Sequence, residues 1–149
     1  MKVNPTPIAA YLEYNKQFTG YAAYNYIPAM MGFLNHDSHF DDPSIQELEG
    51  YKPDFEESFA QYQDAAIVVV GRPSSENGDY KVGGVLEGRG NSEPLELTNN
   101  ERDIIRMATD NFEKVIVLVN CANTMEIKEL QDNEKIDAIV WIGHPGAFG

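Results

Sequence analysis

The segment Gly71–Tyr80 carries the side chains best suited to acid–base chemistry. It reads Gly-Arg-Pro-Ser-Ser-Glu-Asn-Gly-Asp-Tyr and directly follows a continuous apolar run. A carboxylate such as Glu76 or Asp79 can donate or accept a proton when its neighbours raise its pKa towards neutrality. The same residues also suit an ordinary turn, because Asn-Gly and Gly-Asp pairs are common in turns and both acids would then be solvated. On composition alone the turn is the more frequent outcome, and both interpretations stay open.

Other patterns with chemical potential are weaker. His36 and His39, with carboxylates nearby, have a spacing that could hold a divalent metal, but no cysteine ligand accompanies them and a polar loop is favoured. The glycine-rich stretch Gly83–Gly90 lacks the Lys-Ser/Thr that completes a phosphate-binding loop. A phosphoacceptor domain would need an aspartate where Asn120 ends an apolar run. We therefore predict no metal site and no cofactor.

Three apolar runs would position these candidates, at residues 65–71, 114–120 and 136–142. Their continuous, β-branched character is typical of strands that are buried on both faces of a parallel sheet. Helical patterns separate the runs, so the chain predicts an α/β fold, a three-layer α/β/α sandwich with a mainly parallel sheet. Right-handed crossovers bring the strand-end loops to one edge, where such sheets bind ligands. Glu76 is expected at that edge.

The clearest helix signal is a capping box, in which Thr98 and Glu101 would each bond a free backbone amide at the helix start. A second, shorter helix is predicted from a cap at Asn123 and Glu126 to about Gln131. The buried stripe of the first helix is expected to consist of Ile104, Ile105 and Ala108.

Residues 1–62 form an N-terminal segment that differs from the regular α/β core expected at residues 63–149. The segment is rich in proline and tyrosine and contains no convincing strand, with Pro7–Lys16 and Pro53–Gln61 as its best helical candidates. A segment of this kind cannot easily bury a core alone. We expect it to pack against a neighbouring domain through tyrosines 11, 14, 21, 24, 26 and 51.

The formal net charge of −13 limits the range of partners. Acidic surfaces repel phosphates and anionic lipid heads, which argues against nucleic acid and membrane partners but permits neutral ligands. The one cysteine, Cys121, ends an apolar run and is expected to be a buried thiol. The first 14 residues do not read as a signal peptide and no run is long enough for a membrane span, so a cytoplasmic location is favoured.

Several ordered segments of the chain resemble glycoside hydrolase family 3. They are the run Ala66–Gly71, a Glu-x-Gly-Asp loop at Glu76–Asp79, Leu-x-Leu-Thr at Leu95–Thr98, the run Lys114–Asn120, and the closing stretch Ala138–Gly146. The resemblance extends over about residues 64–149 and leaves residues 1–62 unmatched. It implies the α/β sandwich domain of a β-glucosidase-like enzyme, with the C-terminal end of the domain truncated here.

In that family a (β/α)8 barrel supplies an aspartate nucleophile and the sandwich domain supplies a glutamate acid/base. The resemblance carries this acid/base role to Glu76, in the retaining hydrolysis of a β-linked oligosaccharide or other glycoside. Ser75, with Ser74, would orient Glu76, and Asp79 would fix the loop; Asp79 and Ser75 would also contact substrate. The arginine that commonly follows this aspartate is Tyr80 here, so substrate contacts are expected to differ. The isolated chain, without a barrel, is expected to be inactive.

Two other functions stay open. The chain could be a stand-alone, non-catalytic module of flavodoxin-like shape that holds a small ligand at the strand edge. Alternatively, its aromatic N-terminal segment could dock a partner, which includes the case of a homodimer.

Overall fold

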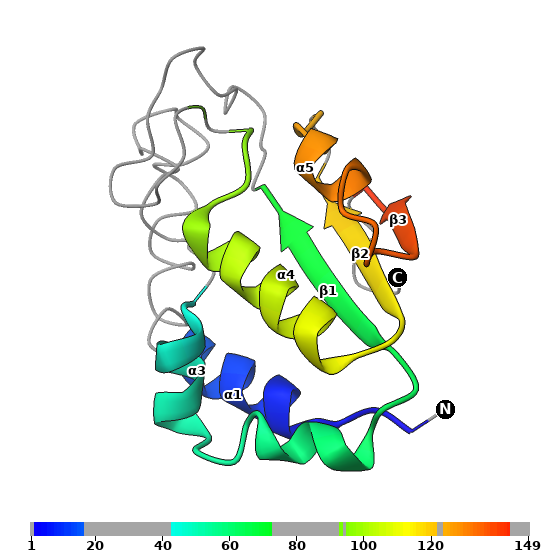
Figure 1. Cartoon of the computed structure of the whole chain (residues 1–149). Coiled ribbons are helices and arrows are strands. Elements are labelled where there is room, and N and C mark those ends of the chain that lie inside the picture. Colours follow the sequence, from blue (N-terminus) through cyan, green and yellow to red (C-terminus); the bar gives the residue numbers. More distant parts are fainter. Residues whose placement is uncertain (1, 17–42, 73–92, 94, 122–123, 144–149) are drawn as a thin grey trace, which may run out of the picture.

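The computed structural model describes residues 2–16, 43–72, 93, 95–121 and 124–143 (Figure 1). Helices α1 and α3 and the 3-10 helix η2 precede strand β1, after which helices and strands alternate. The bounds in chain order are α1 Pro5–Lys16, α3 Ile45–Tyr51, η2 Glu57–Gln61, β1 Ala66–Gly71, α4 Asn99–Asn111, β2 Val115–Asn120, α5 Lys128–Gln131 and β3 Ala138–Trp141.

The described strands form a parallel sheet in the order β1-β2-β3. Val68 of β1 pairs with Val117 of β2, which in turn pairs with Ile139 of β3. Each connection between consecutive strands includes a helix, as parallel pairing requires (Figure 1). The predicted α/β class and the parallel sheet are therefore confirmed, and β3 is shorter than the predicted strand at residues 136–142.

One face of this sheet builds the main core. Side chains at alternate positions of β1 and β2, including Val70 and Val117, are buried together with Ile105 of α4 and Leu130 of α5. The opposite face carries Ile67 and Val69, whose side chains are 53% and 51% exposed. Within the described residues, the helices thus cover one face, and the predicted second helical layer is not among them.

Helix α4 begins as the sequence predicts. The hydroxyl of Thr98 accepts a hydrogen bond from the Glu101 amide at 3.2 Å, and the Glu101 carboxylate accepts one from the Thr98 amide at 2.8 Å. Ile105 and Ala108 are buried beneath the helix, and Ile104 is partly buried. The capping box therefore fixes where the helix starts over the sheet.

The predicted start of α5 is wrong. Helix α5 begins at Lys128, with Ile127 before it and no side-chain cap. Glu126 does not act in a cap because its amide donates instead to the carbonyl of Leu95 at 3.1 Å. The chain before α5 thus pairs with the chain before α4, and the predicted cap residue Asn123 lies outside the described residues.

The N-terminal helices pack on α4. Ala10, Leu48 and Phe55 form a second buried cluster that also contacts Ile104 and Met107 of α4. Helix α1 matches the predicted helix but starts at Pro5, whereas the helix predicted at Pro53–Gln61 is the shorter η2. Helix α3, with its own capping box of Ser44 and Glu47, was not predicted.

Candidate active site

The carboxyl ends of the three strands meet at one edge of the sheet, as the sequence predicts. Gly71 ends β1 opposite Asn120 of β2, and the two chains approach closely here. A Cβ atom at position 71 would lie 2.7 Å from the Asn120 carbonyl oxygen, which no real side chain tolerates without movement. The sequence therefore needs glycine at this point, where the chain leaves the sheet towards residues 73–92.

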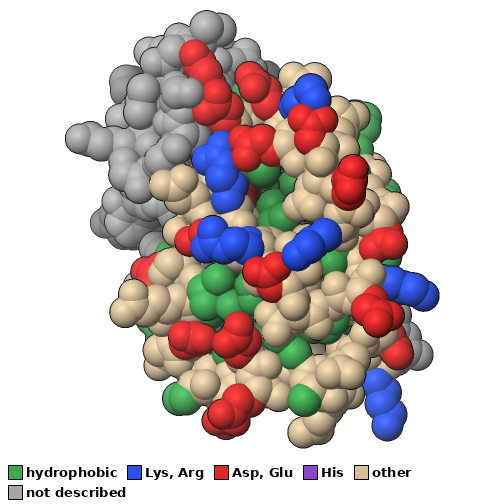
Figure 2. All heavy atoms as spheres, viewed as in Figure 1, with side chains coloured by type: hydrophobic (Ala, Val, Ile, Leu, Met, Phe, Trp, Pro, Cys, Tyr) green, Lys and Arg blue, Asp and Glu red, His purple; other side chains and the backbone are tan. Residues whose placement is uncertain are grey.

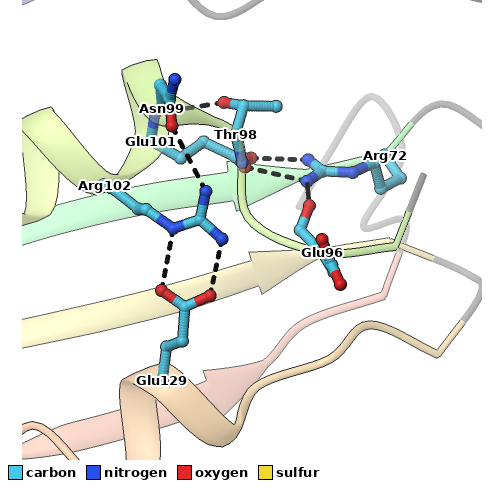
Figure 3. Close-up of polar contacts among 7 residues, drawn as sticks. All are labelled: Arg72, Glu96, Thr98, Asn99, Glu101, Arg102 and Glu129. Carbon is cyan, nitrogen blue, oxygen red and sulfur yellow. Dashed lines mark hydrogen bonds and ion pairs between the residues drawn. The ribbon is translucent and has the colours of Figure 1, made fainter. Parts of the chain in front are cut away.

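A buried ion pair lies at this exit. Arg72, the residue after β1, places Nη1 2.6 Å from Oε1 and Nη2 2.8 Å from Oε2 of Glu101 at the start of α4 (Figure 3). The two side chains are 2% and 1% exposed. This two-point geometry suits a guanidinium and a carboxylate, and it fixes the orientation of both groups.

The same arginine joins the two ends of the segment 73–92. Its guanidinium also donates to the backbone carbonyl of Glu96, which follows that segment, and to the carbonyl of Gly71, which precedes it. Glu101 in turn bonds the amide of Thr98. We call Arg72, Glu96, Thr98 and Glu101 the loop clamp, because they hold the points where the segment leaves β1 and enters α4 (Figure 3).

The loop clamp is a buried charge site whose groups satisfy one another. The Glu101 carboxylate accepts two hydrogen bonds from Arg72 and one from the Thr98 amide. Its place in the first turn of α4 also sets its charge against the positive end of the helix dipole. Removing one partner of such a pair leaves an uncompensated buried charge, which costs about 3–5 kcal/mol.

The predicted site residues Glu76, Asp79 and Ser75, with Ser74, lie outside the described residues. Their roles remain predictions. The structure instead fixes the ends of the segment that contains them. Residue types alone did not reveal the loop clamp, although an arginine directly after a buried strand and a glutamate in the first turn of the next helix were its visible signals.

A second, more exposed ion pair joins the helices of the covered face. Arg102 of α4 donates from Nε and Nη2 to the Glu129 carboxylate of α5, at 2.8 and 2.6 Å (Figure 3). The bond from Arg102 lowers the pKa of Glu129, and the bond to Glu129 raises the pKa of Arg102. Acidic and basic side chains are interspersed on this face (Figure 2). We infer that the Arg102–Glu129 pair helps to hold α4 against α5 and has no role in the candidate site.

Cys121 and Trp141 lie near the carboxyl ends of β2 and β3. The Cys121 thiol is buried as expected, and burial raises its pKa. The Trp141 indole donates to the Cys121 carbonyl at 2.7 Å while its side chain is 68% exposed. The indole therefore offers an open aromatic face at the strand-end edge and is not part of the core.

The described residues contain no group of three or more histidine, cysteine, aspartate or glutamate side chains that could hold a metal ion. His36 and His39 are outside this part of the chain. In the same described portion, no helix has both the length and the apolar character needed to cross a membrane.

The glycosyl hydrolase family 3 C-terminal domain matches residues 7–149. The chain belongs to this family. The match also takes in most of the N-terminal segment, for which residue patterns alone gave no resemblance. The helices of that segment, which pack on α4, thus lie almost entirely within the matched residues.

Two β-glucosidases are similar to this family 3 domain. "Beta-glucosidase A" of Butyrivibrio fibrisolvens is 29% identical over 104 residues, and "Beta-glucosidase" of Ruminococcus albus is 30% identical over 92 residues. Each alignment covers 60% of the chain but only 12% and 9% of the relatives' own lengths. No solved structure is matched significantly.

Proposed function

We propose that this family 3 domain supplies the general acid/base of a retaining β-glycosidase, and that Glu76 is that residue. The loop clamp is the observation that carries the proposal. It holds both ends of the Glu76 segment at the carboxyl edge of a parallel sheet, where such folds bind ligands. An acid/base residue must stay within hydrogen-bond reach of the glycosidic oxygen. This requires that the two ends of its loop be held in place.

The chemistry needs a second carboxylate from a barrel domain. In the first step Glu76 donates its proton to the leaving glycosidic oxygen, while the nucleophile bonds the anomeric carbon. In the second step the Glu76 carboxylate takes a proton from the water that releases the sugar. Retaining enzymes hold the two carboxyl groups about 5–5.5 Å apart, so the barrel must dock over this edge. The substrate is a β-linked glucoside or related glycoside, and the chain alone is catalytically silent.

The dependence of rate on the leaving group tests this role. In a protein that joins this domain to a family 3 barrel, E76Q should lower kcat/KM for an alkyl β-glucoside far more than for a dinitrophenyl β-glucoside, because kcat/KM reports the first step, in which a good leaving group needs no proton. Acid catalysis contributes about 10²–10⁴-fold. E87Q, an acid-to-amide change in the same segment, is the matched control and should leave both rates unchanged. Equal losses for both substrates in E76Q would refute the assignment.

A further inference from the structure

Trp141, the one tryptophan of the chain, ends strand β3 at the carboxyl edge of the sheet. It pairs in register with Val119 of β2, so the two side chains project from the same face of the sheet. Val119 is 4% exposed, whereas Trp141 is 68% exposed, which is the highest value among the exposed large hydrophobic residues of the described chain. The indole therefore remains open at the edge where the Glu76 segment leaves β1.

A hydrogen bond fixes the indole at this edge. Its Nε1 donates to the backbone carbonyl of Cys121 at 2.7 Å. An indole has one hydrogen-bond donor and no acceptor, so this bond leaves the flat apolar faces of the ring for any further contact. A ring that is already held in place also loses less conformational freedom when a ligand binds. The position therefore suits a ligand that presents an apolar face to an aromatic ring.

The charges of the chain narrow the class of ligand. Aromatic faces stack on nucleic-acid bases and on the C–H face of a sugar ring. The net charge of −13 disfavours ligands that carry phosphate, such as nucleotides. Arg72, a cation at the same edge, is 2% exposed and bonded to Glu101. A neutral sugar ring, which has a C–H face and hydroxyl groups, meets both conditions.

We propose that Trp141 stacks on a sugar ring of the substrate and sets a preference for oligosaccharides over glycosides of a single sugar. This inference rests on the proposed glycosidase function. Neighbouring strands lie about 4.8 Å apart, so the end of β3 lies about 10 Å from the end of β1, where the Glu76 segment begins. The indole thus lies beside the exit of that segment and would contact a neighbouring sugar unit. Trp141 is then a specificity-determining residue and not a catalytic one.

The Nε1–H signal of Trp141 gives a direct test in the 149-residue chain. Because the chain has one tryptophan, its indole signal is identified at once in an NMR spectrum of the isotope-labelled protein. We expect cellotetraose, a β-linked glucose oligosaccharide, to shift this signal progressively as its concentration rises. Sorbitol, which has hydroxyl groups but no ring, should leave the signal in place at the same concentrations.

Substitutions at position 141 measure the effect on specificity. In a protein that joins this domain to a family 3 barrel, W141A should lower the ratio of kcat/KM for cellotetraose to kcat/KM for dinitrophenyl β-glucoside about three- to tenfold, the usual worth of an aromatic contact. W141F keeps an aromatic face and should recover most of this loss. V140A, on the same strand, 43% exposed and on the opposite face of the sheet, is the matched control and should leave the ratio unchanged.

Two results would overturn the proposal. One is an indole signal that moves no more with cellotetraose than with sorbitol. The other is an unchanged ratio of the two kcat/KM values in W141A. If W141A then also lowers the unfolding temperature of the joined protein, the ring is covered by other polypeptide instead. Failure of the acid/base assignment of Glu76 would leave the indole shift intact, because stacking on Trp141 requires no catalysis.

Discussion

Replacing Arg72 by methionine tests whether the loop clamp stabilises the fold as its geometry implies. The substitution keeps an apolar stem of similar length but removes the cation that donates two hydrogen bonds to the Glu101 carboxylate. The carboxylate is then left in a site where it is 1% exposed. We expect the free energy of unfolding to fall by about 3–5 kcal/mol, the usual cost of breaking a buried pair.

Urea denaturation followed by circular dichroism measures this loss. With a slope of about 2 kcal/mol per molar urea, the midpoint should fall by about 1.5–2.5 M. The double variant R72M/E101Q supplies the decisive control, because glutamine can still serve in the capping box and no charge is left buried. Replacing both charges of a buried pair is often neutral. The double variant should therefore recover at least about 2 kcal/mol relative to R72M.

The reasoning about the loop clamp is wrong if R72M costs less than about 1 kcal/mol. It is equally wrong if R72M and E101Q show no coupling, so that their losses simply add in the double variant. Both results would mean that the pair contributes little despite its short distances and its burial.

Three further perturbations test other parts of the structure. Because the Arg102 bond lowers the pKa of Glu129 below its ordinary 4.5, the stability from this pair is present above that pH and is lost as the pH falls through the lowered pKa. The urea midpoint of E129Q should thus be slightly below that of the wild type at pH 7, and the difference should shrink as the pH falls below 4.5. Gly71→Ala places a Cβ 2.7 Å from a β2 carbonyl oxygen and should destabilise by about 1–3 kcal/mol, while Gly50→Ala in α3, with nothing within 4 Å, should stabilise slightly. Cys121, buried and with a raised pKa, should react with a thiol reagent at pH 8 much more slowly in the native chain than in urea; equal rates would contradict its burial.

The sequence was most informative where local patterns and packing agree. Continuous β-branched runs predicted the three strands of the described residues, and the Thr98–Glu101 capping box predicted the start of α4. Both are short-range signals that the tertiary structure reinforces. The prediction for the start of α5 was wrong because a long-range contact overrides the local pattern. The Glu126 amide donates to the distant Leu95 carbonyl instead of joining a helix.

The loop clamp shows why the site could be predicted only in part. Glu101 was assigned a capping role, which is correct, but its charge is paired with Arg72, 29 residues earlier in the chain. No local sequence pattern predicts an ion pair between residues so far apart in the chain, because the pair forms only when β1 and α4 pack together. The role of Glu76 depends on family membership and on the clamp at the ends of its segment.

Azide rescue of an E76A variant tests the central proposal most directly. In a protein that joins this domain to a family 3 barrel, removal of the proposed acid/base would leave the glycosyl-enzyme without a base to activate water. Azide needs no such base, so it should restore turnover of dinitrophenyl β-glucoside and give the β-configured glucosyl azide, identified by NMR. No rescue by azide, or wild-type activity in E76A, would contradict the assignment of Glu76.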